Sequence, residues 1–266
     1  MERIADQQYL VGDQYKDSSK LSARIQLHEL FSTNSYGWMR WVFDHLIDLP
    51  NDARILELGS GRGTLWKENL SRIPSGWRVT LSDLSPGMLD SAKTNLEDVG
   101  REFEFKNMDA QAIPYPDNTF DGVVANHMLY HVPDRAKALA ETHRVLKPGG
   151  RLFAATNGRG SMHALWDMLN SVAPSSADDF GRPAHLFSLE SGEGELLEKF
   201  STVTVDRYED ALHVTRVKPV IDYIQSIRRK LNDQQVAEVR RIVGGEIDRN
   251  GNFVIDKANG ILIARK

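Results

Sequence analysis

An acid and three alternating glycines stand together in the stretch ILELGSGRGTL. Glu57 precedes Gly59, Gly61 and Gly63. Glycines let a backbone turn sharply and approach a ligand without Cβ clashes. A carboxylate beside them disfavours a pyrophosphate and favours a cationic or amine-bearing ligand. The glycines alone are also compatible with a tight strand-to-helix turn that binds nothing.

The spacing of these glycines differs from two common phosphate-binding loops. The dinucleotide fingerprint is G-x-G-x-x-G, and Thr64 stands where its third glycine would fall. The P-loop needs G-K-[ST], which this segment lacks. A nicotinamide-dependent oxidoreductase is therefore an alternative that the sequence disfavours.

Two more acids follow the next two apolar runs. Asp83 lies near the end of WRVTLSDL, and Asp109 near the end of FEFKNMDA. The carboxyl ends of parallel strands meet at one edge of a sheet, where ligands bind. Asp83 could accept both hydroxyls of a ribose there, and Asp109 could accept from the exocyclic amine of a base. Three acids at adjacent strand ends predict a nucleoside that carries positive charge and no phosphate, as S-adenosylmethionine does.

The pattern of apolar residues predicts the sheet that would position these acids. From residue 53 to about 157, short apolar runs alternate with helical patterns, which predicts βαβ units and a parallel sheet with helices on both faces. One helix is expected to begin at Pro86 with Ser85 as its N-cap. The alternation then lapses: we expect an insertion over 158–187, two amphipathic helices over 217–243 and strands over 244–266.

Four motifs in order resemble those of class I S-adenosylmethionine-dependent methyltransferases. They are ILELGSGRG, VTLSDLSPGML, FKNMDAQAIPYPDNTFDGVVANHMLYHV and RVLKPGGRL, and they look most like the type-11 branch, which includes quinone-biosynthesis enzymes. The resemblance covers residues 53–157 and implies a Rossmann-like doubly wound α/β fold with seven strands, mostly parallel with an antiparallel last strand. It also implies a set of cofactor-binding residues: Glu57, Gly59, Ser60 and Gly61 for the methionine part, Asp83, Leu84 and Met88 for the adenosine, Asp109, Ala110 and Gln111 for the adenine edge, and Asn126 and His131 near the methionyl group.

The segment NHMLYHVPD holds the candidate catalytic groups. It follows the expected fourth strand, so it would lie beside the reactive methyl group. His127, Tyr130 and His131 are the candidates, because histidine can take a proton near neutral pH. The competing interpretation is that His131 contacts the cofactor without acting as a base. His127 and His131 are four residues apart, but with no third acid on that face they do not predict a metal site.

Residues 1–35 and 158–187 are expected to cover the cofactor and select the acceptor. We expect one domain over residues 1–266: N-terminal helices and cover (1–52), cofactor-binding core (53–157), cover insertion (158–187) and the remaining sheet with a helical insertion (188–266). Trp38 is expected in the core, since aromatic residues at helical spacing usually pack there. The candidate substrate contacts are Tyr15, Arg24, His28, His163, Trp166 and His185.

Composition limits the classes of function. The 266 residues are 41% hydrophobic and 26% charged, with a net charge of −4 and no cysteine. These values suit a globular protein, exclude thiolate chemistry and give no basic patch for nucleic acid. The polar N-terminal segment does not look like a signal peptide, and no run is long and apolar enough for a membrane span. We therefore expect a cytoplasmic protein.

The expected function is methyl transfer from S-adenosylmethionine to a small-molecule acceptor, which leaves S-adenosylhomocysteine. The acceptor atom, oxygen, nitrogen or carbon, is left open. The alternative from another class is a catalytically silent protein that binds the cofactor and acts as a partner.

Overall fold

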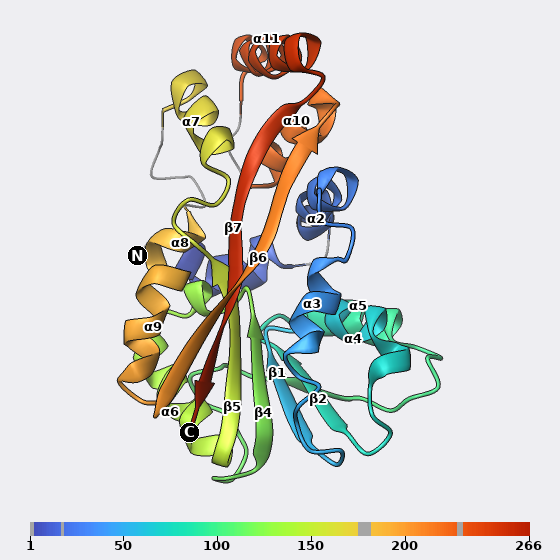
Figure 1. Cartoon of the computed structure of the whole chain (residues 1–266), viewed down its shortest axis with the longest axis vertical. Helices are drawn as coiled ribbons and strands as arrows, with labels where there is room; N and C mark the ends of the chain where they lie inside the picture. The colour runs from blue at the N-terminus through green and yellow to red at the C-terminus, as the bar shows by residue number, and fades with distance from the viewer. Residues whose placement is uncertain (1–2, 17–18, 175–181, 228–230) are drawn as a thin grey trace.

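A computed structural model describes residues 3–16, 19–174, 182–227 and 231–266 of the chain. These residues form a seven-stranded sheet in the order β3-β2-β1-β4-β5-β7-β6 (Figure 1). Neighbouring strands from β3 to β5 pair in parallel, and β7 is antiparallel to both β5 and β6. The strands are β1 (Arg54–Leu58), β2 (Arg78–Asp83), β3 (Glu104–Asn107), β4 (Phe120–Asn126), β5 (Leu146–Asn157), β6 (Thr202–Val214) and β7 (Phe253–Arg265).

The order of the strands reverses between β1 and β4. From β1 the chain proceeds outward to β2 and β3, and it then returns to the other side of β1 with β4 and β5. The connections leaving β1 and β4 therefore diverge at their carboxyl ends and open a crevice between them. Leu58 and Asn126 end these two strands, so the glycine loop and the NHMLYHV segment face each other across the crevice.

Helices cover both faces of the sheet. They are needed on both faces because successive side chains of a strand point to opposite sides, and apolar side chains occur on each side. Ile55 packs on one face with residues of α3 and α4, whereas Leu56 and Leu58 pack on the other. Figure 1 shows α3, α4 and α5 on one side and α6 and α9 on the other. Their bounds are α3 (Trp38–Asp44), α4 (Thr64–Glu68), α5 (Pro86–Asn95), α6 (Arg135–Val145) and α9 (Leu189–Leu197).

Strands β6 and β7 continue beyond the rest of the sheet as a two-stranded arm (Figure 1). Residues 259–265 of β7 pair with β5, whereas residues 253–258 pair with β6 alone. The arm projects past the crevice and carries helices around it. These are α2 (Ser19–Phe31), α7 (His163–Val172), α10 (Val217–Ser226) and α11 (Asp233–Asn250), while η1 (Arg3–Ala5), α1 (Gln7–Tyr9), η2 (Leu10–Gln14) and α8 (Pro183–Leu186) lie nearer the crevice.

Most elements agree with the sequence-based predictions, with two corrections. The mostly parallel doubly wound sheet, its antiparallel last strand and the N-cap at Ser85 are confirmed. Residues 244–250 were expected as strand, but they complete α11, which ends where Gly251 adopts φ +79°. The helix expected after the glycine loop is short, because Asn69 leaves helical geometry and its amide donates to Leu65 O at 2.8 Å.

Within the described ranges, no helix has the length and apolar character needed to cross a bilayer.

Two glycines of α9 provide a test of packing against the sheet. A Cβ on Gly192 would lie 2.6 Å from Leu262 Cδ1 and 2.7 Å from Phe187 Cζ, whereas a Cβ on Gly194 would meet nothing within 4 Å. We expect Gly192→Ala to lower the free energy of unfolding by about 1–3 kcal/mol through overpacking. Gly194→Ala, the matched control, should raise it by about 0.5–1 kcal/mol, because alanine favours helix. Urea denaturation measures both, and equal effects would contradict the packing described for α9.

Candidate active site

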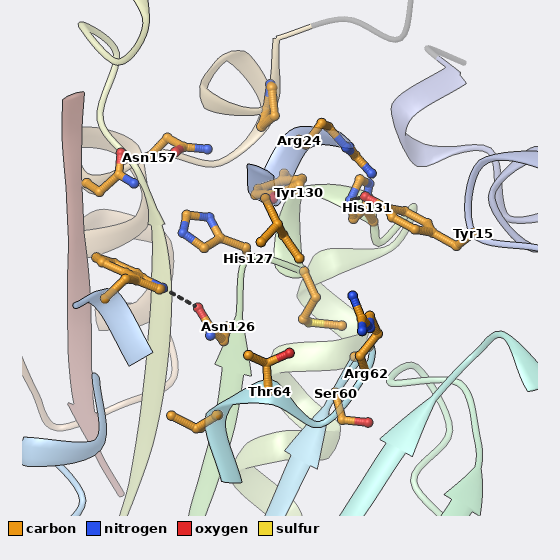
Figure 2. A pocket seen from close by; sticks show the side chains of 18 of the residues that line it. Tyr15, Arg24, Ser60, Arg62, Thr64, Asn126, His127, Tyr130, His131 and Asn157 are labelled. Carbon is orange, nitrogen blue, oxygen red and sulfur yellow. Dashed lines mark hydrogen bonds between the residues drawn. The ribbon is translucent and has the colours of Figure 1, made fainter. Parts of the chain in front are cut away.

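A single large cavity lies over the carboxyl ends of β1, β2 and β4. Its volume is about 790 Å³, which is within the range of small-molecule sites. Figure 2 shows Ser60, Arg62 and Thr64 on its floor, with His127 and Tyr130 above them and Arg24 and Tyr15 to one side. The cavity continues from the glycine loop toward the arm, where Asp210 and Lys257 line it.

The glycine loop needs glycine for its backbone. Gly59, Gly61 and Gly63 have φ of +64°, +55° and +68°, a region that other residues enter at a cost. A Cβ on Gly59 would also lie 2.7 Å from Met128 Cβ. Between these glycines, the buried hydroxyl of Ser60 has no hydrogen-bond partner among the described residues. The loop therefore presents an unsatisfied polar atom at the cavity wall, as expected of a ligand-binding loop.

Glu57 is buried beneath the loop. Only 2% of this residue is exposed, and its carboxylate accepts from Trp66 Nε1 at 2.7 Å. Burial raises the pKa of Glu57 to about 8, and the nearby charge of Asp83 adds to the rise. At neutral pH the side chain is thus largely protonated, and a cationic group beside it would favour ionisation.

Asp83 ends β2 and supports the loop. Its carboxylate accepts from Gly61 N at 3.0 Å and from Ser85 N at 2.8 Å. Burial raises the pKa of Asp83, although these backbone donors oppose the rise. The same carboxylate therefore fixes the turn of the loop and the start of α5, and it lines the cavity between them.

Asp109 lies two residues beyond β3 and binds the N-terminal segment. Its carboxylate accepts from the backbone and side chain of Gln111 and from Gln7 Nε2 at 3.0 Å. Burial alone would raise the pKa of Asp109, but these hydrogen bonds hold it below its ordinary value. The carboxylate is ionised at neutral pH and can accept from an amine that replaces Gln7.

His131 is held between two partners. Its Nδ1 lies 2.7 Å from Ile4 O, and its Nε2 lies 2.9 Å from the Tyr15 hydroxyl. Because a carbonyl can only accept, Nδ1 carries the proton and Nε2 accepts from Tyr15. Burial lowers the pKa of His131 to about 3, so the ring is neutral. Tyr15 and His131 both line the cavity.

His127 occupies a strained position directly after β4. Its φ of +55° is unusual for a residue with a side chain. The ring packs against Trp38 with centroids 5.2 Å apart and planes tilted by 42°. Burial lowers the pKa of His127 to about 4. Trp38 also donates from Nε1 to Asn126 Oδ1 at 3.3 Å; Figure 2 marks this bond. Trp38 and His127 thus form one aromatic wall beside the end of β4.

Tyr130 lies between these groups in the cavity wall. Burial raises the pKa of Tyr130 well above its ordinary value, and the neighbouring Tyr15 adds to the rise. Its hydroxyl therefore keeps its proton at neutral pH and can only donate or accept a hydrogen bond.

Nearly all the residues singled out from the sequence line this cavity. Two do not: Gln111 faces away, donating to Asp109 and accepting from Asp134 N at 3.0 Å, and His163 is largely exposed beside Asp167 on α7. The residues that the structure brings together are Tyr15, Arg24, His28, Glu57, Gly59, Ser60, Gly61, Asp83, Leu84, Met88, Asp109, Ala110, Asn126, His127, Tyr130, His131, Trp166 and His185.

Sequence reasoning missed several lining residues. Trp38 was expected in the core, and it does pack against the apolar cluster of one face, but it also lines the cavity. Asp210 and Lys257 lie on β6 and β7, 47 residues apart, and no motif surrounds them. No local signal points to them, because the same two strands carry other charged residues, among them Asp206, Arg207 and Asp256.

Metal ligands were also sought. Over the ranges that the structure describes, no group of three or more histidine, aspartate or glutamate side chains is arranged to hold a metal ion.

The buried carboxyl of Glu57 makes stability depend on pH. Its pKa rises from 4.5 in the unfolded chain to about 8 in the folded one, so its contribution is fully present below pH 4.5 and is lost as the pH rises through 8. Glu57→Gln keeps the acceptor for Trp66 and removes this loss. The stability difference between variant and wild type should thus change by up to about 1.4 kcal/mol per pH unit between pH 5 and 8. Denaturant titrations at several pH values measure it, and a constant difference would refute the assignment.

Comparison with known proteins agrees with this geometry. Residues 56–154 match the family model described as "Methyltransferase domain". The ubiquinone/menaquinone biosynthesis C-methyltransferase UbiE of Enterobacter sp. (strain 638) is 35% identical over 118 residues, which cover 44% of this chain and 47% of that protein. The chain thus spans about half the length of the curated relatives it matches.

Solved structures share the fold. The YcgJ protein of Bacillus subtilis superposes with a TM-score of 0.58 at 17% identity, covering 85% of this chain and 98% of that one. Phosphoethanolamine N-methyltransferase 2 of Haemonchus contortus, in complex with S-adenosyl-L-methionine, superposes with a TM-score of 0.58 at 18% identity. The superposition covers 98% of this chain and 59% of that one. These solved structures therefore share the fold, and the family match places a methyltransferase domain over residues 56–154.

Proposed function

We propose that this protein transfers a methyl group from S-adenosylmethionine to a small-molecule acceptor. One observation carries the proposal: three carboxylates, Glu57, Asp83 and Asp109, line the floor of one cavity beside a glycine loop with an unsatisfied hydroxyl. That arrangement suits a cationic nucleoside without a phosphate. The family match over residues 56–154 supports the same conclusion.

The residues present fit this cofactor. Gly59, Ser60 and Gly61 would hold the methionine part, with Glu57 beneath the loop. Asp83 would accept from the ribose hydroxyls, while Leu84 and Met88 flank the adenosine. Asp109 and the Ala110 N–H would bind the adenine edge, with Gln7 yielding its bond to Asp109. Asn126, oriented by Trp38, would face the methionyl group.

When bound, S-adenosylmethionine supplies a methyl group that passes to the acceptor by in-line displacement. The chain has to align the acceptor at near-attack distance, and such alignment is worth up to about 7–11 kcal/mol. The aromatic wall of Trp38 and His127 and the hydroxyls of Tyr15 and Tyr130 surround the place where the acceptor would lie. A base is needed only if the acceptor keeps its proton at neutral pH.

The paired Tyr15 and His131 are the first candidate for removing that proton, although the low pKa that burial gives His131 makes its ring a weak base. The Tyr15 hydroxyl can pass its proton to Nε2 of His131 along the 2.9 Å contact and accept one from the acceptor. The Ile4 carbonyl, bound to Nδ1, would stabilise the resulting imidazolium. His127 is the second candidate, since its ring lines the cavity, whereas Tyr130 serves as a hydrogen-bonding residue.

The proposal also includes the segments that cover the cavity, the class of acceptor and the location of the protein. In this proposal the described parts of residues 1–52 and 158–187 cover the core of 53–157 and select the acceptor, and those of 188–266 complete a single domain; residues 1–2, 17–18, 175–181 and 228–230 lie outside the described residues. The acceptor is a small molecule rather than nucleic acid, given the net charge of −4. A cytoplasmic location fits the lack of cysteine. Nothing favours a silent binding protein or an oxidoreductase.

The cofactor assignment predicts selective binding of the product, S-adenosylhomocysteine. Calorimetric titration should give micromolar affinity for this ligand and no binding of NADH. Asp83→Ala should weaken binding by about 100-fold or more, because two charge-assisted hydrogen bonds are lost.

Thermal unfolding of Asp83→Ala shows whether the variant is folded, since Asp83 also supports Gly61. Asp52→Ala, an exposed acid outside the cavity, is the matched control and should bind like the wild type. Tight binding of NADH, or no binding of S-adenosylhomocysteine to the wild-type protein, would refute the proposed function.

The proton-relay assignment predicts a separation of binding from turnover. Tyr15→Phe keeps the ring and removes the hydroxyl, so it should leave the affinity for S-adenosylhomocysteine within about threefold. Turnover of an acceptor that must lose a proton should fall by about 10²–10⁴-fold. Release of S-adenosylhomocysteine from a panel of acceptors provides the assay. If His127→Gln abolished turnover while Tyr15→Phe retained it, His127 would be the base instead.

A further inference from the structure

A buried ion pair lines the cavity on the side of the arm. Lys257 of β7 and Asp210 of β6 form a salt bridge, and their side chains are only 5% and 0% exposed. Both residues line the same cavity as the glycine loop. Burying two charges is costly unless further hydrogen bonds satisfy them, so the partners of each charge show what the pair is suited to do.

The carboxylate of Asp210 accepts several hydrogen bonds from residues around it. Besides Lys257, it accepts from the hydroxyls of Ser32 and Thr33 and from the backbone N–H groups of Thr33, Asn34 and Ala211. These donors tie the turn after α2 to β6. The negative charge of Asp210 is thus distributed over neutral donors as well as over the ammonium.

Lys257 is only partly satisfied. An ammonium has three N–H donors, and Asp210 is its one hydrogen-bond acceptor among the described residues. The ammonium also lies 5.9 Å from the centroid of the Tyr208 ring. Since Lys257 lines the cavity, its remaining donors are available to a ligand there. A carbonyl or an anion is the group that such donors would bind.

The neighbours of Lys257 also present polar atoms to the cavity. His28 lines the same wall, and its Nδ1 is buried with no partner among the described residues. Asn259 accepts from Ser161 through Oδ1 at 3.0 Å, which leaves its Nδ2 donors available to the cavity. No second carboxylate appears beside Lys257 in the described part of this wall; the other acids of the cavity are Glu29 and Glu68, near each other, and those of the floor.

Charge is unevenly distributed along the cavity. Glu57, Asp83 and Asp109 lie on the floor near the glycine loop together with Arg62, where the proposed cofactor brings positive charge. Arg24, Arg159, Arg182 and Lys257 line the rest of the cavity, where they outnumber the acids. Arg24 packs over the Tyr15 ring at 5.3 Å, and Arg182 over the Trp166 ring at 5.1 Å. A molecule that fills this part meets cationic and aromatic groups together.

We propose that the acceptor carries an oxyanion, a carboxylate or a phosphate, that binds Lys257 on the arm side of the cavity. The inference rests on the proposed function, because it places the acceptor's reactive atom near the floor and its anionic end at the arm. Lys257 holds the anion, and Asp210, satisfied by its other donors, holds Lys257. The acceptor is accordingly a small anionic molecule rather than a neutral quinone or a cation.

The test uses matched ligands with the full-length protein saturated with S-adenosylhomocysteine. Calorimetry compares 4-hydroxybenzoate with 4-hydroxybenzamide for the carboxylate, and phenyl phosphate with phenol for the phosphate. At least one anion should bind about 10-fold or more tightly than its neutral counterpart. Lys257→Met should weaken that anion by about 10-fold to 100-fold and leave S-adenosylhomocysteine affinity unchanged.

Two further variants keep the test decisive. Lys218→Met removes the cation of an exposed Lys–Asp pair on α10 and should behave like the wild type. Lys257→Arg, which keeps the charge, should retain most of the anion affinity, so that a folding defect in Lys257→Met does not leave the question open.

The outcomes separate the two proposals. Binding of S-adenosylhomocysteine with no preference for either anion over its neutral counterpart would overturn the oxyanion site while the proposed function stands. Loss of anion binding in Lys218→Met as well as in Lys257→Met would also overturn it. Failure of the wild-type protein to bind S-adenosylhomocysteine would instead overturn the proposed function itself.

Discussion

Three carboxylates share the floor of one cavity, and their burial constrains everything built around them. Each is satisfied differently: Glu57 by the indole of Trp66, Asp83 by backbone N–H groups of the loop and of α5, and Asp109 by glutamine amides. A buried carboxylate without such donors would be protonated or would destabilise the fold. The hydrogen-bond donors therefore influence which of these side chains are ionised in the absence of a ligand. Asp109 is ionised, whereas Glu57 is largely protonated.

The N-terminal segment is coupled to the same floor. Gln7 donates to Asp109, the carbonyl of Ile4 binds His131, and Ser85 donates to the carbonyl of Tyr15 at 2.7 Å. Each bond joins a residue of the first sixteen to a residue that either lines the cavity floor or follows β4. The position of this segment and the arrangement of Tyr15 over the cavity therefore depend on each other. A ligand that replaced Gln7 at Asp109 would act on both.

Local rules allowed the sequence to predict the floor but not the arm. The glycine loop, the N-cap at Ser85 and the acids near the ends of β1 and β2 are each determined by neighbours within a few residues, and all were predicted. Asp210 and Lys257 meet only because β6 and β7 pair over 13 residues each, which no local pattern encodes. Residues 244–250 were expected as strand but form the end of α11, because packing of α11 against α7, α10 and β7 outweighs the low helix propensity of Gly244 and Gly245. His163 and Gln111 have suitable side chains but do not line the cavity. His163 lies on the exposed face of α7, and Gln111 is turned away by a local Asx-type turn at Asp109.

The family match covers residues of the cavity floor but none of the arm. The family match ends at residue 154, so it contains Glu57, Asp83, Asp109 and the segment after β4. Tyr15, Arg24, Asp210 and Lys257 all lie outside it, on elements that pack over the cavity from the N-terminal segment, α2 and the arm. The similarity over residues 56–154 therefore bears on the floor of the cavity and not on the part that faces the arm. The acceptor has to be inferred from this chain's own cavity, and there the partly satisfied ammonium of Lys257 is the group that most limits the choice.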